Sequence, residues 1–318
     1  MTATSETKRN NQRHQRRNVD GVLLLDKPHG ITSNAALRSA QRLCGASKAG
    51  HTGTLDPLAT GLLPVCFGEA TKFSQVLLHA EKTYLARMRL GVTTTTGDLE
   101  GEVTGRAPVA VTRDQVEAVL QHFVGEIVQI PPMYSAIKKD GQPLYKLARA
   151  GRDVPRTPRK VMVKTLSLLD IAGEEIELAV TCSKGTYIRV LAEDIGRKLG
   201  CGACLSALRR TAVGSFTLKG GAVTLPQLEA LTPQQRDPLL LPPDTLVASL
   251  PRFDLDADQA RRITRGQALE EVAGLLLPGL TRIYGPERQF LGLAEVMDRG
   301  RMVPRRLRSQ EVAGLLLE

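Results

Sequence analysis

The sequence has no tryptophan, few aromatic residues and no long hydrophobic run. No apolar stretch reaches the ~18 residues of a membrane-spanning helix, so we expect no membrane segment. The amino-terminal residues are polar and basic, which is not typical of a secretory signal. The five cysteines are odd in number and scattered over 318 residues, which favours reduced thiols in a cytoplasmic protein.

Two of the cysteines, Cys201 and Cys204, form a C-x-x-C pair. A zinc site would need a second pair or histidines at ligand spacing, and none follows. A redox site would need a thioredoxin-like setting, which the surrounding sequence does not have. We therefore expect small residues that pack near a turn, and no metal site.

Positive charge is in excess: 43 Lys and Arg stand against 33 Asp and Glu, a net charge of +10. A polyanion such as nucleic acid is the usual partner of such a chain, although a basic surface can also serve solubility alone. Because aromatic residues make up only 3% of the chain, the places of the five tyrosines are informative. Four of them lie near a Lys or a turn signal, and we expect some of these rings to face a ligand: Tyr84, Tyr134, Tyr145 and Tyr187.

Residues 50–61, GHTGTLDPLATG, combine glycine and proline punctuation with a single carboxylate, Asp56. Glycine and proline interrupt helices and strands, so the stretch predicts a rigid loop that presents this carboxylate. Ordinary turns have the same composition. Composition alone therefore leaves a structural turn and a catalytic loop equally open.

Hydrophobic periodicity and capping residues predict a mixture of helices and strands around this loop. We expect a helix after Thr32 or Ser33 that ends at Gly45, and a strand over residues 62–67 in which Pro64 would suit only an edge or a bulge. Further helices are predicted at 70–78, 112–123 and 186–199, and further strands at 83–91 and 175–183. Lys27, in the turn before the first helix, is either a phosphate contact or a solvated surface lysine, and composition favours the surface lysine.

Arg189 falls in the first turn of the predicted helix at 186–199. Cations are disfavoured at helix amino termini. A carboxylate from another segment is the natural partner for this guanidinium; the alternative is an arginine at a rim that reaches solvent.

Residues 131–159 are the most basic irregular stretch. Aromatic side chains are interleaved with basic ones there. This composition is typical of a segment that binds RNA, where guanidinium groups and rings stack on bases. A solvated charged loop is the alternative, and we favour RNA contact. The residues concerned are Lys138, Lys139, Lys146, Arg149, Arg152, Arg156 and Arg159, with Tyr134 and Tyr145 between them.

Four motifs in register resemble the bacterial tRNA pseudouridine-55 synthases of the TruB family: GVLLLDKPHGITS at 21–33, GHTGTLDPLATG at 50–61, EKTY at 81–84 and SKGTYIRVLAEDIG at 183–196. The resemblance implies an α+β fold: a mixed α/β catalytic domain on a long, mostly antiparallel sheet, followed by a small β-rich PUA-like domain. We expect a disordered basic tail at 1–18, the catalytic domain at 19–248 with its RNA-contacting insertion at 131–159, and the PUA-like RNA-binding domain at 249–318.

The same resemblance implies the activity. The substrate would be the T-arm of tRNA, in which uridine 55 is flipped out and becomes pseudouridine. The enzyme would act in the cytoplasm as a monomer, without a cofactor, a metal or a protein partner.

Catalytic roles carry over from the family to three residues. Asp56 matches the aspartate nucleophile that breaks the bond between uracil and ribose. Tyr84 matches the tyrosine that stacks on the target base and is implicated in removing its C5 proton. Arg189 matches the arginine that pairs with the nucleophile.

Substrate-binding roles carry over to four more residues. His51 matches the histidine that enters the T-loop where bases leave the stack. Tyr187 and Leu208 match residues that contact the flipped nucleotide. Lys27 matches a motif lysine with a supporting role.

Three other functions are alternatives to this hypothesis. A tRNA-binding or tRNA-folding module, whose catalysis is secondary, would have the same charge and the same carboxy-terminal domain. A synthase directed to other RNAs by guide-RNA partners is disfavoured because no long basic extension follows the last domain. A generic nucleotide enzyme is excluded because no phosphate-binding glycine motif follows a strand.

Overall fold

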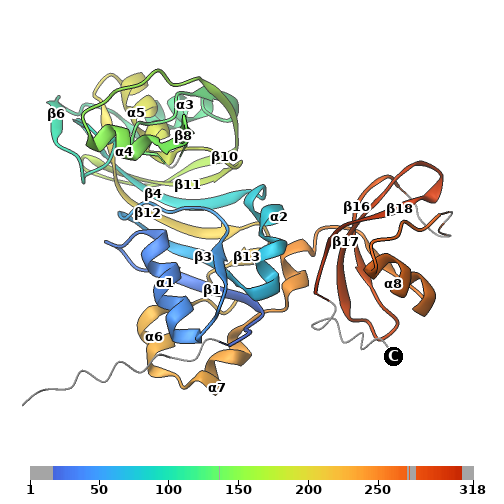
Figure 1. The fold of residues 1–318 in the computed structure, drawn as a ribbon. Helices are drawn as coiled ribbons and strands as arrows, with labels where there is room; N and C mark the ends of the chain where they lie inside the picture. The colour runs from blue at the N-terminus through green and yellow to red at the C-terminus, as the bar shows by residue number, and fades with distance from the viewer. Residues whose placement is uncertain (1–16, 136, 271, 273–276, 310–318) are drawn as a thin grey trace, which may run out of the picture.

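A ten-stranded sheet runs through most of the molecule in the computed structural model, which describes residues 17–135, 137–270, 272 and 277–309 (Figure 1). The predicted tail at 1–18 lies outside the described residues except for its last two positions. The main path of the sheet is β14-β1-β3-β12-β4-β11-β10-β7, with β13 beside β12 and β2 beside β3. The strands are β1 (Gly21–Lys27), β2 (Ala49–His51), β3 (Ala59–Phe67), β4 (Lys82–Leu90), β7 (Gly125–Gln129), β10 (Arg159–Ala172), β11 (Glu175–Cys182), β12 (Ala203–Val213), β13 (Phe216–Thr217) and β14 (Val223–Thr224).

Antiparallel pairs predominate in this sheet, and of its described strand pairs only β1–β14 and β12–β3 are parallel. Helices cover the sheet: α1 (Ser33–Cys44) packs on β2 and β3, α3 (Arg113–Gln121) packs on β10, and α5 (Ile188–Leu199) packs on β12. The remaining elements before residue 249 are η1 (Gly68–Lys72), α2 (Ser74–Leu78), β5 (Val92–Thr94), β6 (Val103–Arg106), α6 (Leu225–Ala230), α7 (Pro233–Arg236), η2 (Asp237–Leu239) and η3 (Pro243–Val247). The predicted α+β class with a long, mostly antiparallel sheet is confirmed.

Local signals in the sequence place the helix ends correctly. The Thr32 hydroxyl accepts from the Ala35 N–H and caps α1, and Gly45 ends that helix at φ 66°, a backbone conformation that suits glycine. Thr112 and Gln115 form a capping box on α3. Gly200 ends α5 at φ 84°.

Burial divides the sheet into two regions. β1 is buried on both faces, which explains its continuous apolar sequence: Leu23 and Leu25 pack toward α1, and Val22 and Leu24 pack on the opposite side. β4 alternates instead, with one face packed against α3 and α5 and the other face toward solvent.

The expectation that Pro64 lies at an edge or a bulge is wrong. Pro64 is inside the sheet, opposite Leu24 of β1. Its carbonyl accepts from the Thr52 N–H just beyond the end of β2, at 3.2 Å. The amide nitrogen and the carbonyl of one residue point to the same side of a strand, so the proline nitrogen, which has no hydrogen, faces the same side as this carbonyl. On that side β3 pairs with β12 before Pro64 and with β2 after it, so no strand hydrogen bond is lost at Pro64 itself.

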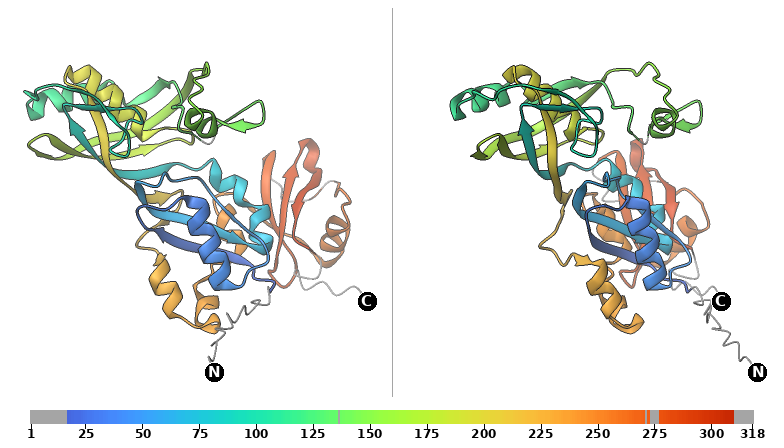
Figure 2. Two further views of the ribbon diagram at one scale, coloured as in Figure 1. Left: turned by 60° about the vertical axis from the view of Figure 1, so that its left-hand side comes forward. Right: turned by 90° about the vertical axis from the view of Figure 1, so that its left-hand side faces the viewer.

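A second sheet of four strands follows in the order β15-β16-β17-β18. Its elements are β15 (Arg252–Asp254), α8 (Ala257–Thr264), β16 (Gly279–Tyr284), β17 (Phe290–Val296), η4 (Asp298–Gly300) and β18 (Met302–Leu307). This small β-rich unit lies beside α2, as the two views of Figure 2 show. The ring of Phe290 packs 5.0 Å from the ring of Phe73, which precedes α2, so one hydrophobic cluster joins the two parts.

The basic stretch at 131–159 contains only short elements: β8 (Lys138–Lys139), β9 (Gln142–Pro143) and α4 (Leu144–Arg149). It leaves the main sheet after β7 and returns at β10. Within the parts of the chain that the structure describes, no helix is long and apolar enough to span a membrane.

Candidate active site

The loop that carries Asp56 is held by side chains on both sides. The Ser33 hydroxyl, at the start of α1, donates to the Leu55 carbonyl at 2.9 Å and accepts from the Leu55 N–H at 2.7 Å. On the other side, the Lys27 ammonium lies 3.5 Å from the Pro57 carbonyl. The residues directly before and after Asp56 therefore have fixed backbone positions, which supports the prediction of a rigid loop.

Lys27 does not have the predicted surface position. Its side chain is fully buried, and its ammonium donates to the carbonyls of Pro28 and Ile31 at 2.8 and 2.7 Å. Burial lowers the pKa of this ammonium to about 8. The geometry favours a role in holding two loops together, not a contact with the substrate.

Arg189 has the anionic partner that the sequence predicts. Its Nε donates to Asp56 Oδ2 at 2.9 Å across 133 residues. The other nitrogens donate to the carbonyls of Thr96 at 2.7 Å and Tyr134 at 2.8 Å. Only one N–H reaches Asp56, so the guanidinium joins three loops at one point.

Asp98 is a second carboxylate at this point, and sequence reasoning missed it. Its Oδ2 lies 3.4 Å from Arg189 Nε. Its Oδ1 accepts from the Thr96 hydroxyl at 2.5 Å and from the Glu100 N–H at 3.2 Å, as an aspartate in a turn does. The side chain of Asp98 is 4% exposed and that of Asp56 is 39% exposed, so Asp56 is the carboxylate of the pair that a substrate can reach.

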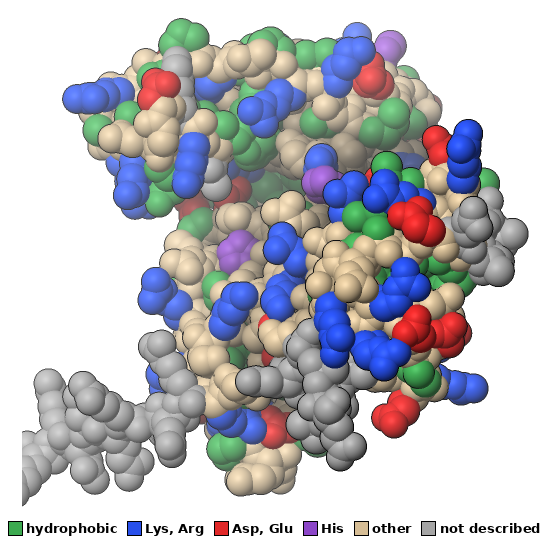
Figure 3. All heavy atoms as spheres, turned by 45° about the vertical axis from the view of Figure 1, so that its right-hand side comes forward, with side chains coloured by type: hydrophobic (Ala, Val, Ile, Leu, Met, Phe, Trp, Pro, Cys, Tyr) green, Lys and Arg blue, Asp and Glu red, His purple; other side chains and the backbone are tan. Residues whose placement is uncertain are grey.

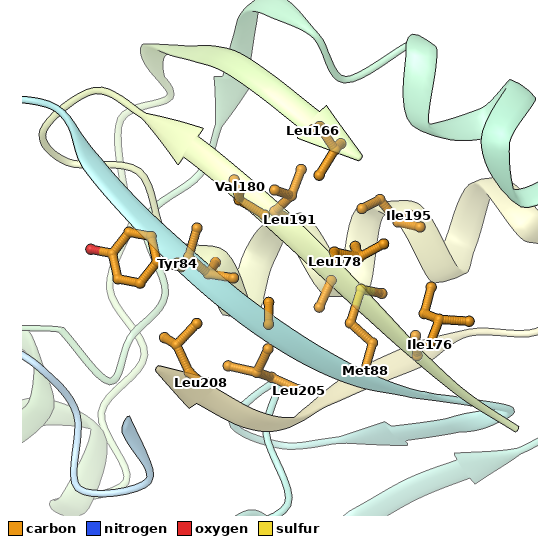
Figure 4. Packing of buried hydrophobic residues seen from close by; sticks show 14 of the residues in the cluster. Tyr84, Met88, Leu166, Ile176, Leu178, Val180, Leu191, Ile195, Leu205 and Leu208 are labelled. Carbon is orange, nitrogen blue, oxygen red and sulfur yellow. The ribbon is translucent and has the colours of Figure 1, made fainter. Parts of the chain in front are cut away.

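Two hollows meet at Asp56 and Arg189. The smaller one, of about 460 Å³, has walls that include Tyr84, Tyr187 and Leu208, all predicted as site residues. Figure 4 shows the Tyr84 ring at the end of the hydrophobic cluster, with Leu208 beside it and the hydroxyl pointing away from the aliphatic side chains. Burial raises the pKa of the Tyr84 hydroxyl.

A glutamine outside the predicted set fixes the backbone of Tyr187. The Gln129 side chain accepts from the Tyr187 N–H at 3.0 Å and donates to the Tyr187 carbonyl at 3.2 Å. Gln129 is buried at the end of β7, so it ties the edge of the sheet to the start of α5. Burial raises the pKa of the Tyr187 hydroxyl as well.

The larger hollow, of about 800 Å³, contains His51 in its wall. His51 ends β2 and is half-buried. Its Nδ1 is buried without a hydrogen-bond partner among the described residues. Burial, with a smaller effect of the Arg210 charge, lowers the pKa of the imidazole, so the ring is neutral at pH 7.

Side chains of the basic stretch at 131–159 reach the same hollow. Tyr134, Tyr145 and Arg149 belong to its wall, so all four tyrosines that the sequence singled out lie at one or the other hollow. Arg149 lies over the Tyr145 ring, 5.7 Å from its centroid. In Figure 3, Lys and Arg side chains stand on both sides of the cleft between the two halves of the molecule.

In the described ranges, no group of three or more His, Cys, Asp or Glu side chains is placed so that it could hold a metal ion. Cys201 and Cys204 are both buried and free, in agreement with the prediction that they pack near a turn.

Family models match successive parts of the chain. Residues 41–188 match the model described as "TruB family pseudouridylate synthase (N terminal domain)". Residues 189–248 match the "tRNA pseudouridylate synthase B C-terminal domain", and residues 251–307 match "Pseudouridine synthase II TruB, C-terminal".

Whole-chain relatives agree with these models. The chain is 56% identical to tRNA pseudouridine synthase B of Aromatoleum aromaticum over 295 residues, which cover 93% of this chain and 94% of the relative. It is 53% identical to the protein of the same name from Methylobacillus flagellatus, with 93% and 97% covered. Among solved structures, Cbf5 in the archaeal box H/ACA sRNP Nop10-Cbf5 complex superposes with a TM-score of 0.71 at 26% identity, over 96% of this chain and 92% of that one.

Proposed function

Because this chain belongs to the TruB family of pseudouridylate synthases, we propose that Asp56 is the residue with which it converts uridine to pseudouridine in tRNA. One observation carries the proposal. A half-exposed carboxylate stands on a held loop, paired with a buried arginine, where two hollows meet. The target we propose is uridine 55 in the T-loop, as the resemblance of the motifs implies.

The reaction is an isomerisation: the bond from the ribose C1′ to N1 of uracil breaks, and a bond from C1′ to C5 forms. C5 loses a proton and N1 gains one, so nothing is oxidised and water does not enter the product. A carboxylate suits this sequence because it can bond covalently to the nucleoside and then leave again. Arg189 fixes the position and the direction of the Asp56 carboxylate through their 2.9 Å contact.

Tyr84 and Leu208 would hold the base while it is detached. The detached uracil must turn before C5 can face the sugar, and contacts with these two side chains would keep it from leaving to solvent. Tyr84 is 8% exposed, and so is Leu208, so both present one edge to the hollow from a packed cluster. A ring in this position can stack on the uracil face, and Tyr187 closes the same hollow.

His51 would occupy the place that the flipped nucleotide leaves. Flipping a base costs a few kcal/mol, which a planar group inserted at the vacancy partly offsets. The neutral imidazole of His51 suits stacking, and it lies in the wall of the larger hollow, on a loop shared with Asp56. In one complex, His51 can therefore fill the place that the flipped nucleotide has left, while Asp56 reacts with that nucleotide.

The partner we propose is the T-arm of tRNA, bound by a monomer in the cytoplasm without a protein partner. The net charge of +10 and the basic side chains along the cleft support a polyanion. The β-rich unit that contains β15–β18 would extend the contact as a PUA-like RNA-binding domain.

The substitution Asp56→Asn tests the proposal. We expect no detectable pseudouridine in a single-turnover assay with T-arm RNA, mapped at nucleotide resolution. The dissociation constant for tRNA should stay within about tenfold of the wild type, because binding is spread over many basic contacts. Asp254→Asn is the control, since this exposed aspartate lies on the distant sheet and pairs with Arg252. Substantial pseudouridine formation by Asp56→Asn would refute the mechanism.

The alternative is a tRNA-binding or tRNA-folding module whose catalysis is secondary. The same variant separates the two, because folding activity does not need a nucleophile. The Asp56–Arg189 contact favours catalysis, since a surface that only binds RNA gains nothing from a paired, half-exposed carboxylate.

A further inference from the structure

Arg210 is the largest fully buried side chain of the described protein, although it carries a charge. It is 1% exposed, and no carboxylate of the described residues lies within ion-pair distance of it. Its guanidinium donates instead to backbone carbonyls: Nε to Leu62 at 2.7 Å, Nη2 to Gly53 at 3.1 Å and Nη1 to Thr54 at 3.5 Å. Burial lowers its pKa. A buried cation without an anion is costly, and an apolar side chain would fill the same space at less cost.

The partners of Arg210 explain why an arginine stands there. Leu62 belongs to β3, and its carbonyl faces the side where β3 leaves β12 before it meets β2. No strand of the described residues pairs with this carbonyl, so the guanidinium takes the place of a neighbouring strand as its hydrogen-bond donor. Gly53 and Thr54 lie in the loop three and two residues before Asp56, so the same group holds this loop to the sheet.

Two glycines of the 50–61 stretch lie directly against Arg210. Gly61 has φ 100°, and a Cβ there would lie 2.3 Å from the Arg210 carbonyl oxygen, so only glycine lets β3 approach β12 at this point. Gly53 has φ 110°, and a Cβ there would meet Arg210 Nη1 at 3.5 Å. Gly61 is therefore required by the close approach of the Arg210 backbone, whereas Gly53 is required by its positive φ and lies in ordinary contact with the guanidinium.

Arg210 also adjoins Tyr84. The two residues are register partners across β12 and β4, so their side chains lie on the same face of the sheet. The guanidinium opposes the rise in the pKa of the Tyr84 hydroxyl that burial causes. Both side chains line the 460 Å³ hollow together with Asp56.

We propose that Arg210 is a positioning residue that sets the Asp56 loop against Tyr84, so that both reach one nucleotide in the smaller hollow. This rests on the proposed function. Arg210 links the two segments that carry these residues: its guanidinium donates to carbonyls of the loop, and Tyr84 is its partner on the neighbouring strand. A displacement of about 1 Å between reacting groups can cost about 100-fold in rate.

The test compares Arg210→Lys and Arg210→Met with Arg209→Lys. Arg209 is the neighbour on the same strand, 42% exposed and paired with Asp26, and it serves as the matched control. For Arg210→Lys we expect a folded protein, a tRNA dissociation constant within about threefold of the wild type, and a single-turnover rate about 100-fold lower. Arg209→Lys should match the wild type in rate. A wild-type rate in a folded Arg210→Lys protein would overturn the proposal.

A second readout separates positioning from a loss of stability. In protein labelled with ¹³C at the tyrosine ring, the Tyr84 resonance of Arg210→Met should titrate at higher pH than in the wild type. Tyr284, on the distant sheet, should not change. An unchanged Tyr84 titration would overturn the contact between the two residues. If Arg210→Met does not fold, Arg210→Lys and Gly53→Ala, which disturbs the same contact from the loop, must both slow the reaction without weakening tRNA binding.

The two proposals can fail separately. If Asp56→Asn abolishes the reaction while Arg210→Lys keeps the full rate, only the role of Arg210 is refuted. If Asp56→Asn stays active, the proposed function is refuted, and the Tyr84 titration still decides whether Arg210 acts on that ring.

Discussion

Arg189 joins several segments of the chain at the site through its guanidinium. Its three donor nitrogens reach one carboxylate and two carbonyls from three separate segments, at 2.7 to 2.9 Å. A lysine has three donors on one nitrogen, and it cannot spread them over the width of a guanidinium. The residue thus does more than neutralise Asp56: it fixes the loops that carry Asp98 and Tyr134 as well.

Arg189→Lys should therefore fold but react slowly. Hydrogen bonds to charged groups contribute about 1.5–3 kcal/mol each, so we expect a single-turnover rate at least about 100-fold lower. Arg197→Lys is the control, because Arg197 is exposed on the same helix and pairs with Asp194. A rate near that of the wild type for Arg189→Lys would show that the pairing is not needed.

His51 makes a pH dependence testable at the same scale. Burial lowers the pKa of its imidazole below the ordinary value of about 6.5. Below pH 6.5 the unfolded chain therefore binds more protons at this residue than the folded chain, and stability falls as the pH falls. We expect the His51 ring to titrate below pH 6.5 by NMR, and His51→Asn to reduce the loss of stability in urea between pH 6.5 and 5.5. Titration at or above 6.5 would contradict this.

At the scale of elements, the stretch at 131–159 connects the site to the surface. Its Tyr134 carbonyl accepts from Arg189, and its helix α4 brings Tyr145 and Arg149 to the larger hollow. Exposed basic residues such as Lys138 and Lys146 extend from this anchored base. The segment can therefore bind phosphates without any part in the chemistry.

Reversing the charge at Lys138 and Lys146 should weaken tRNA binding and leave the rate at saturating tRNA unchanged. Each lost phosphate contact lowers the salt slope of the logarithm of the binding constant by about one, so we expect a decrease of about two. Lys160→Glu with Lys164→Glu gives the same change in charge on β10, where these lysines pair with Glu126 and Glu81. An unchanged slope would remove residues 131–159 from the interface.

At the scale of the whole molecule, the two sheets share one hydrophobic cluster. Phe73 packs against Phe290, and Tyr284 lies 5.5 Å from Phe290 between ring centroids. Arg308 near the end of the described chain also pairs with Asp20 at 3.4 Å. The β-rich unit is thus held at a defined place beside α2, from which it can bind a long RNA together with the cleft.

Phe290→Ala should loosen this junction. Removing a buried phenylalanine costs about 3–5 kcal/mol, so we expect calorimetry to show the β-rich unit unfolding in a separate transition before the large sheet. The affinity for tRNA should fall while the rate at saturating tRNA is retained. Phe253→Ala, within the small sheet, is the control for the loss of a ring away from the junction. A single transition with an unchanged midpoint would contradict the expectation.

Signals between near neighbours in the chain were sufficient for much of the fold. The caps of α1, α3 and α5 and the alternation of β4 and β11 depend on residues a few positions apart. The place of Arg189 at a helix amino terminus predicted an anionic partner, but it did not identify which carboxylate this is. The prediction for Pro64 is wrong because its tolerance depends on which strand stops beside it. The prediction for Lys27 is wrong because the loop around Pro57, 30 residues away, packs over the turn that contains Pro28 and Ile31.

The sequence by itself determined the family, the loop that carries Asp56, the tyrosines at the hollows and the need of the Arg189 guanidinium for an anionic partner. Only the tertiary structure decided that Asp98 shares that arginine, that Lys27 is buried and that Arg210 joins the loop to Tyr84. The physical reason is distance along the chain. Ion pairs and hydrogen bonds that join residues 91 to 157 positions apart depend on strand order and burial, which no local pattern of residue types contains.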